Sequence, residues 1–572
     1  MKFIIKKIYI ILLLLTLISQ GPELLAKDST IKYTKENISN YFLGIVSLKK
    51  NYNDKAIKHL KKIESLKNHH SQYNVELLKT LVLVEQFEKA FSFSKKVWHE
   101  DDLLFEVDLL LGLDYLLKKK YTKAEKHFER LNEDNQYNIF FDDFISTVLL
   151  AWTEAGKGNK EKSFKYLNSI PGPYEQLKEP QNIFLQCYFD AANTQKSFEN
   201  LENNKRYNFS RYNFFLVNYL LSKNKNNEAL IVIKNSRKKY NSNILIKQTE
   251  EFILNNKNKK IKSFFDCKNL NDNLAEFFYV MANFYSNDQN YKLSNFYLKI
   301  SLFLNNRFLP NKALLAENYY YQNKNKKSKK IYSSLKPIGS VYSWYASKNI
   351  TRILLKEKSE KYSLNKLKEE FNSLPKLNLE HYYDLANFYK DNNFYEESVK
   401  YYSSALKMTK KNHFLFAKIL DRRGTSFERL GDWENAEQDL IESLKILPDQ
   451  ANVLNYLAYT WVDKGINLDE AFIMLNKANK LQKNDPYIID SLGWAYYAKK
   501  KYPEAKLHLQ RALELLPLDP IINDHYADTL WMLNKDIQAR YIWSHILEFN
   551  ETGQKLKDTI NKKLIFGITK KL

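Results

Sequence analysis

Glycine and proline are scarce in this sequence, with 13 and 12 residues in a chain of 572. An average protein has about 7% glycine and about 5% proline. β-rich and α/β folds of this length need many tight turns, which these two residues supply. The scarcity therefore argues against those fold classes and favours helices joined by short polar loops. A hydrophobic fraction of 44% with 27% charged residues excludes a disordered chain.

Cysteine is also rare, and the two present, Cys187 and Cys267, lie far apart in the sequence. Neither belongs to a C-x-x-C or Cys/His spacing, which argues against zinc ribbons and thioredoxin-like chemistry. Two such distant cysteines also predict no disulfide framework. Motifs of hydrolases, metalloproteases and phosphate-binding loops are missing from the sequence. We therefore predict a protein that is not an enzyme and has no cofactor and no metal site.

The chain is basic, with a formal net charge of +23 from 89 Lys+Arg against 66 Asp+Glu. Such a charge often indicates nucleic acid or an anionic membrane as a partner. Here the excess is almost all lysine and is interleaved with Glu and Asp, whereas nucleic-acid-binding proteins concentrate basic residues on one face. We expect no nucleic-acid partner, and a basic nucleic-acid-binding protein is the weakest alternative.

Residues 1–26 have the layout of a secretory signal peptide. Lys2, Lys6 and Lys7 precede an apolar run at 8–18, which is shorter than the ~20 residues that a membrane-spanning helix needs. We predict cleavage after Ala26 and export to a bacterial periplasm. The alternative is that the segment is retained as an N-terminal anchor in the inner membrane, and only then do we expect contact with a membrane.

A 34-residue period runs through the rest of the chain. It is clearest near the C-terminus, where Pro486 and Pro520 are 34 residues apart. The residues that follow keep this spacing: Leu492 with Tyr526, Gly493 with Ala527, Ala505 with Ala539 and Leu509 with Trp543. Small residues let two helices approach closely, while large apolar residues fill the space around the contact. The period therefore predicts a repeated helix-turn-helix unit.

The pattern begins again near residues 37, 71, 105, 144, 210, 275, 309, 379, 417, 451, 486 and 520. Three gaps are close to two periods, and we infer one degenerate repeat in each of 177–209, 244–274 and 343–378. About fifteen repeats then fill the chain. The predicted domains are a signal peptide at 1–26, divergent repeats at 27–375, a well-formed block at 376–553, and a basic capping helix or tail at 554–572.

Residues 486–519 resemble the tetratricopeptide repeat (TPR), with Leu492, Gly493, Tyr496 and Ala505 at the offsets of that family. The resemblance implies an all-α fold, a TPR-type α-solenoid in which helix pairs stack into a superhelix. Segments 454–471, 485–497 and 519–531 are similar to the C-terminal repeats of bacterial envelope TPR proteins, some of which are adaptors for carboxyl-terminal processing proteases. This similarity implies a protein or peptide partner, with an envelope protease as one candidate.

In TPR arrays the first helix of each pair lines the concave side. The outward positions of these helices in the last three repeats are Asn452, Asn455, Tyr459, Asp463, Asp490, Trp494, Tyr497, Asp524, Asp528 and Trp531. Aromatic rings provide rigid contact area, and carboxylates favour Lys, Arg or an amino terminus. We predict a peptide-binding groove here, with Trp494 and Trp531 having no packing role in their own repeats. The alternative is that these side chains cover a neighbouring helix or face solvent.

These observations together predict a non-catalytic, exported scaffold or adaptor that binds a protein or peptide partner in the bacterial envelope. One alternative is an accessory subunit of a cell-envelope enzyme, such as a protease or a cell-wall or glycan enzyme. The repeats leave no segment of about 100 residues for a separate catalytic domain, so the chain itself is not expected to hold the active site.

Overall fold

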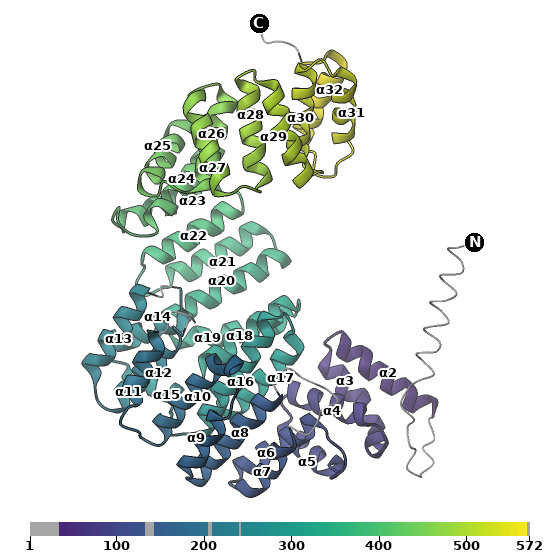
Figure 1. Cartoon of the computed structure of the whole chain (residues 1–572), viewed down its shortest axis with the longest axis vertical. Coiled ribbons are helices and arrows are strands. Elements are labelled where there is room, and N and C mark those ends of the chain that lie inside the picture. Colours follow the sequence, from purple (N-terminus) through teal and green to yellow (C-terminus); the bar gives the residue numbers. More distant parts are fainter. Residues whose placement is uncertain (1–33, 132–141, 204–208, 240–241, 569–572) are drawn as a thin grey trace. The chain divides into compact units, whose positions relative to one another are not determined.

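The structure is a computed structural model that describes residues 34–131, 142–203, 209–239 and 242–568. The predicted signal peptide at 1–26 lies outside the described residues. Within these ranges the chain forms 31 α-helices and no β-strand (Figure 1). The predicted all-α fold is therefore confirmed. The helices belong to two compact units, which divide between Lys356 and Glu357.

The first unit contains short 3-10 helices at Lys61–Asn68, Gly172–Tyr174 and Lys336–Ile338 and the α-helices α2 (Lys35–Lys49), α3 (Asn53–Leu60), α4 (Ser71–Leu83), α5 (Phe87–Val97), α6 (Phe105–Leu117), α7 (Tyr121–Arg130), α8 (Asp142–Lys157), α9 (Lys160–Asn168), α10 (Glu175–Tyr188), α11 (Thr194–Glu202), α12 (Tyr212–Ser222), α13 (Asn226–Lys239), α14 (Ile244–Leu254), α15 (Asn258–Phe264), α16 (Leu270–Asn287), α17 (Tyr291–Leu304), α18 (Leu309–Tyr321), α19 (Asn325–Leu335) and α20 (Ser340–Glu357).

The second unit contains α21 (Glu360–Asn372), α22 (Leu379–Asp391), α23 (Tyr395–Lys407), α24 (Phe416–Arg429), α25 (Trp433–Ile446), α26 (Ala451–Lys464), α27 (Leu468–Leu481), α28 (Pro486–Ala498), α29 (Tyr502–Leu515), α30 (Pro520–Met532), α31 (Asp536–Ile546) and α32 (Gln554–Phe566). It begins at Glu357, one helix before the predicted start of the well-formed block at residue 376.

The helices from α2 to α31 follow one another in chain order as fifteen pairs, and α32 comes last. The segments inferred to hide degenerate repeats contain α10 and α11, α14 and α15, and α20 and α21. In many pairs the turn after the first helix contains a residue in the left-handed backbone conformation. Examples are Asn51, Glu85 and Lys119, with φ of 60°, 63° and 57°. These three positions are 34 residues apart, and their turns explain how the chain reverses with so little glycine.

Asp-Pro pairs start two helices of the best-formed repeats. The Asp485 carboxylate accepts hydrogen bonds from the N–H groups of Tyr487 and Ile488, at 3.0 and 3.2 Å. Asp519 caps α30 in the same way. Proline follows each aspartate at the first helical position, where no N–H is needed. The 34-residue spacing of the two prolines is therefore the spacing between the first residues of α28 and α30.

A close approach of paired helices underlies each repeat. A Cβ atom at Gly493 of α28 would lie 2.6 Å from Leu509 Cγ of α29. Ala505 beside Leu509 is fully buried. These are the small and large positions that the period predicted, so the packing within this pair follows directly from the sequence.

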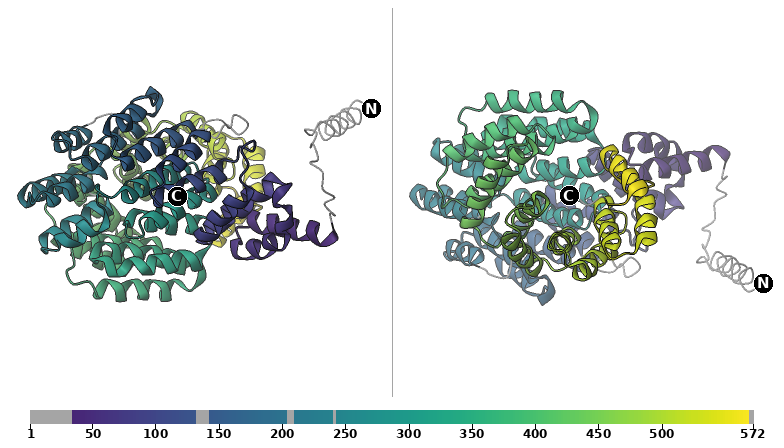
Figure 2. Two further views of the ribbon diagram at one scale, coloured as in Figure 1. Left: turned by 90° about the horizontal axis from the view of Figure 1, so that it is seen from below. Right: turned by 90° about the horizontal axis from the view of Figure 1, so that it is seen from above.

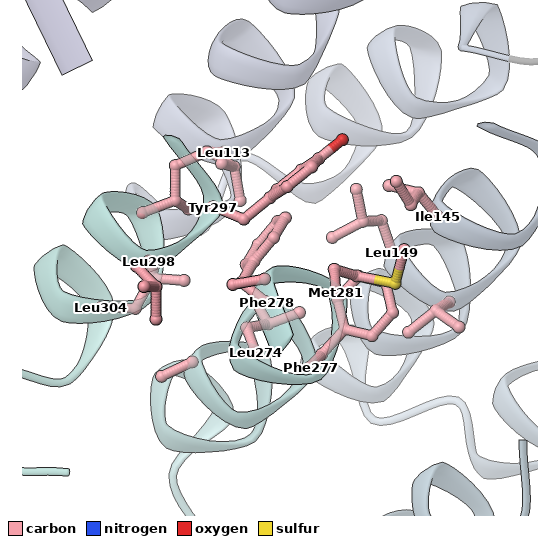
Figure 3. Close-up of a cluster of buried hydrophobic side chains, with 14 of the residues drawn as sticks. Leu113, Ile145, Leu149, Leu274, Phe277, Phe278, Met281, Tyr297, Leu298 and Leu304 are labelled. Carbon is pink, nitrogen blue, oxygen red and sulfur yellow. The ribbon is translucent and has the colours of Figure 1, made fainter. Parts of the chain in front are cut away.

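In the first unit, helices from distant repeats pack together in one continuous core. Phe277, Phe278 and Met281 of α16 belong to the same buried cluster as Leu113 of α6 and Leu149 of α8 (Figure 3). Helices α8 and α10 contact α16 directly. Because α6, α8, α10 and α16 are all first helices of their pairs, the side that would line a concave groove is filled by the chain itself.

The same unit closes a second contact between repeats that are far apart in sequence. Helix α17 packs against α4, and the Phe303 ring stacks on Phe87 with a centroid distance of 4.1 Å. Buried Lys299 of α17 forms an ion pair with Glu85. The first unit is thus wound back onto itself.

Cys187 and Cys267 form a disulfide, with their Cα atoms 5.9 Å apart. The sequence analysis expected no such bond because 80 residues separate the two cysteines. That expectation is wrong. The winding of the first unit brings α10, which carries Cys187, against α16, and Cys267 lies just before α16.

In the second unit the pairs stack one after another along a curved path (Figure 2). The first helices contact each other, α26 with α28 and α28 with α30, whereas α27, α29 and α31 make few or no direct contacts with one another. The first helices therefore line the inner side of this array and the second helices its outer side.

We expect Gly493→Val to weaken the contact between α28 and α29 by overpacking, at a cost of about 1–3 kcal/mol in the free energy of unfolding. Hydrogen exchange of the full chain should become faster in these two helices first. Gly553→Val is the matched control, because a Cβ atom at Gly553 meets nothing within 4 Å. Equal effects of the two substitutions would contradict this packing.

Candidate partner-binding surface

Four of the predicted site residues lie along one face of α26: Asn452, Asn455, Tyr459 and Asp463, which are spaced at three or four residues. Asn452 and Asp463 are exposed, whereas Asn455 and Tyr459 are half-buried. Burial raises the pKa of the Tyr459 hydroxyl, and the carboxylates of Asp463, Asp490 and Asp524 raise it further. Carboxylates therefore lie near this hydroxyl, although the chain as a whole is basic.

Aromatic rings stack across the inner side from α28 to α30. Tyr497 lies parallel to Trp494 with a centroid distance of 4.4 Å, and Trp494 lies parallel to His525 at 4.0 Å. Tyr459 is 6.2 Å from His525 in a tilted arrangement. The structure thus brings Tyr459, Trp494 and Tyr497 together, as the sequence predicted. All three are half-buried, so part of each remains open to a partner.

His525 completes this stack, and the sequence analysis missed it. The equivalent residue one repeat earlier is Ser491, so the 34-residue register gave no signal for a histidine. His525 Nδ1 lies 3.0 Å from both carboxylate oxygens of Asp490. Burial alone would lower the pKa of His525, but the Asp490 carboxylate more than compensates and raises it. Asp490 is therefore paired within the protein.

Asp524 and Asp528 are covered by the C-terminal helix α32. Lys563 Nζ lies 2.7 Å from Asp524 Oδ1 and 2.8 Å from both oxygens of Asp528. Trp543 Nε1 also donates to Asp528, at 3.2 Å. These two predicted site residues are buried and bind helix α32 through Lys563, so they do not present free carboxylates to a partner.

Trp531 packs inside its own repeat. Its ring lies 5.5 Å from that of Trp543 on the paired helix α31, and the Arg540 guanidinium lies 5.3 Å from its centroid. Gly567 packs so closely on the ring that a Cβ atom there would lie 2.1 Å from it. The expectation that Trp531 has no packing role is therefore wrong. Trp494 also packs within its own repeat, on Tyr497, and stacks in addition on His525 of the next repeat, so the expectation is wrong for Trp494 as well.

The part of the predicted groove that remains accessible consists of Asn452, Asn455, Tyr459, Asp463, Trp494 and Tyr497. It combines rigid rings with two amides and the exposed carboxylate of Asp463. In the part of the chain that the structure describes, no group of three or more His, Cys, Asp or Glu side chains could hold a metal ion. None of the described helices is long and apolar enough to span a membrane.

Comparison with known proteins identifies the repeat. Residues 486–519 match the family model of the tetratricopeptide repeat. A TPR repeat-containing protein of Pseudomonas aeruginosa is 36% identical over 99 residues, which are 17% of this chain and 17% of that protein. The chain thus matches less than a fifth of the length of this relative.

Solved structures with a similar fold include a tetratricopeptide repeat protein of Parabacteroides merdae, with 18% identity and a TM-score of 0.33 over 39% of this chain and 88% of the other. Cut9 with Hcn1 from the APC/C shares 14% identity, with a TM-score of 0.36 over 93% and 96% of the chains. Yeast Tom70 shares 14% identity, with a TM-score of 0.31 over 92% and 94%.

The contact between α30 and the C-terminal helix α32 contains ionisable groups, so we expect its stability to depend on pH. Burial, together with the Asp524 carboxylate, raises the pKa of Asp528 from 3.8 to about 7, although Lys563 acts in the opposite direction. The folded state then holds this proton more tightly than the unfolded state, so stability is lost as the pH rises through this interval. The raised pKa of His525 acts in the same direction. Its contribution to the free energy of unfolding is present in full below the unfolded pKa of 6.5, and it is lost as the pH rises above the folded pKa.

We therefore expect α30 and α32 to be held more firmly at about pH 5 than at about pH 8. Hydrogen exchange at a series of pH values, corrected for the intrinsic exchange rates, measures the opening free energy of these helices. Asp528→Asn should remove the part of the dependence below about pH 7. It should also reduce the part that belongs to His525, because the Asp528 carboxylate helps to raise the pKa of His525. An opening free energy that increases with pH would contradict this assignment.

Proposed function

Because the chain is an all-α protein of tetratricopeptide repeats, a fold that suggests a scaffold for protein–protein interaction, we propose that it is an exported, non-catalytic scaffold that binds a protein or peptide partner in the bacterial envelope. The partner binds on the inner side of the second unit. The surface consists of Asn452, Asn455, Tyr459, Asp463, Trp494 and Tyr497.

One observation carries this proposal: the two units differ in what occupies their inner sides. In the first unit α16 packs against the first helices α8 and α10 and shares a buried core with α6, so the chain itself covers their inner sides. In the second unit the first helices contact their neighbours in the stack, α26 with α28 and α28 with α30, and α32 covers part of α30. Their inner face keeps half-buried rings and exposed polar side chains within reach of a partner.

The chemistry of this face favours a basic segment. Stacked rings offer contact area at little cost in conformational entropy. The exposed carboxylate of Asp463, on the same face of α26 as Tyr459, favours a lysine, an arginine or an amino terminus. The asparagine side chains on α26 can pair with the backbone of an extended peptide. The resemblance to envelope adaptors suggests a protease as the partner.

Export is supported by two independent features. Residues 1–26 have the basic start and short apolar run of a signal peptide. The disulfide between Cys187 and Cys267 is of a kind that persists in oxidising compartments such as the periplasm and is rare in the cytosol. Retention of the N-terminal segment would instead anchor the protein to the inner membrane.

The binding surface is tested by cross-linking the full chain to its partner in the native envelope. We expect Tyr459→Ala with Asp463→Lys to lower the recovered partner at least about tenfold, because the pair removes a ring and reverses the local charge. Tyr362→Ala is the control, since Tyr362 lies on α21 and is 47% exposed.

Asp463→Lys alone keeps this test independent of folding, because Asp463 is exposed and its replacement should not alter the melting temperature. It should still weaken partner recovery measurably. Undiminished recovery with both variants, at unchanged melting temperature, would place the partner elsewhere on the molecule.

Export is tested by the intact mass of the protein purified from the envelope without reductant. We expect a chain that begins near Lys27, with Cys187 and Cys267 protected from alkylation until reductant is added. Full-length protein in the membrane fraction would favour the anchored alternative. Full-length protein in the cytosol with both thiols free would refute export.

A further inference from the structure

Three exposed apolar side chains recur at one position on the outer side of the second unit. Ile473 of α27, Leu507 of α29 and Tyr541 of α31 are each 34 residues apart, and they are 68%, 70% and 70% exposed. Each lies two residues after a fully buried alanine, at Ala471, Ala505 and Ala539. They therefore occupy the same place in three consecutive repeats and form a row across three second helices.

Other repeats of the same chain show that this place does not require an apolar residue. Two residues after the buried small residue of their second helices, six pairs carry an exposed lysine: Lys58, Lys126, Lys165, Lys196, Lys330 and Lys400. The pair before the row has exposed Gln438 there, and an isolated Ile231 occupies the place in α13. An exposed apolar residue at this place in three consecutive repeats therefore sets the last three repeats apart from the others.

The row ends beside a pocket of about 480 Å³ between α29, α30 and α31. Tyr526 and Leu530 line it, and Ile537 stands at its wall with 86% of its surface exposed. Ile537 precedes Tyr541 by one helical turn, so both point to the outer side of α31. Apolar side chains therefore gather at this end of the row, and exposed apolar patches mark interaction sites.

Two lysines give the pocket a positive charge. Lys506 and Lys535 both line it, and they lie close enough that Lys535 lowers the pKa of Lys506. Neither forms an ion pair with an acidic residue in the described part of the chain. A ligand that carries an anionic group next to an apolar group would therefore match the charge and the lining of this pocket.

We propose that the row of Ile473, Leu507, Ile537 and Tyr541, with Lys506 and Lys535, is a second docking surface and that it binds an acidic amphipathic helix of another protein. Ile537 and Tyr541 lie beside Lys506 and Lys535 at the pocket. A helix with an apolar face flanked by acidic side chains therefore matches both the apolar row and the charge of the two lysines.

The geometry favours a helix over an anionic membrane. The row lies on the outer side of an array that is curved (Figure 2), so a flat membrane would contact little of it at once. A helix is narrow enough to lie across the second helices. This surface lies on the second helices, opposite the inner side of the first helices, so the inference does not depend on the proposed function.

The test uses the full chain and a synthetic helix of about 21 residues, or six turns, with leucine at every seventh position and glutamate beside each leucine. Leu507→Lys with Tyr541→Lys is the decisive variant, because lysine is the residue that six other repeats carry at this place. It should fold normally. We expect the acidic helix to bind the unaltered chain and to lose at least about tenfold in affinity with the variant.

A second variant, Lys506→Glu with Lys535→Glu, tests the charge. It should weaken the acidic helix and improve binding of the same helix with lysine in place of glutamate. Lys58→Glu with Lys126→Glu is the matched control, since these exposed lysines lie outside the row. The proposal is overturned if the acidic helix does not bind, if it binds all variants equally, or if phosphatidylglycerol vesicles bind instead and the Leu507→Lys, Tyr541→Lys variant abolishes that binding.

Discussion

The close approach of two short helices is the contact on which the rest of this protein depends. In the best-formed pair it is made by Gly493 against Leu509, with a Cβ distance of 2.6 Å that only glycine permits. A single pair cannot bury its own apolar surface, so each must stack on the next. Repetition of this contact produces a long chain of helices from a sequence with few glycines, few prolines and one covalent cross-link.

The same contact has different consequences in the two units. In the first unit the stack winds back onto itself, so that α16 and α17 meet helices that precede them by more than a hundred residues, and the disulfide joins α10 to the start of α16. In the second unit the stack stays open and ends under α32, where Lys563 neutralises two carboxylates. A closed stack provides a rigid body, and an open stack provides two accessible faces.

Periodicity in the sequence was sufficient to predict the helix pairs, the degenerate repeats and the face on which Tyr459, Trp494 and Tyr497 lie. These follow from local rules that repeat every 34 residues. The disulfide, the role of His525 and the pairing of Asp524 and Asp528 with Lys563 could not be predicted, because each joins residues from different repeats or from the C-terminal helix α32. Trp531 was misjudged for the same reason, since Gly567 of the C-terminal segment covers it.

The central claim is that the inner side of the second unit binds the partner. Hydrogen exchange of the full chain with and without the partner recovered from the envelope tests this most directly. We predict slower exchange in α26 and α28 and no change in α6, α8 and α16 of the first unit. Protection confined to the first unit, or to the outer helices α27 and α29, would contradict it.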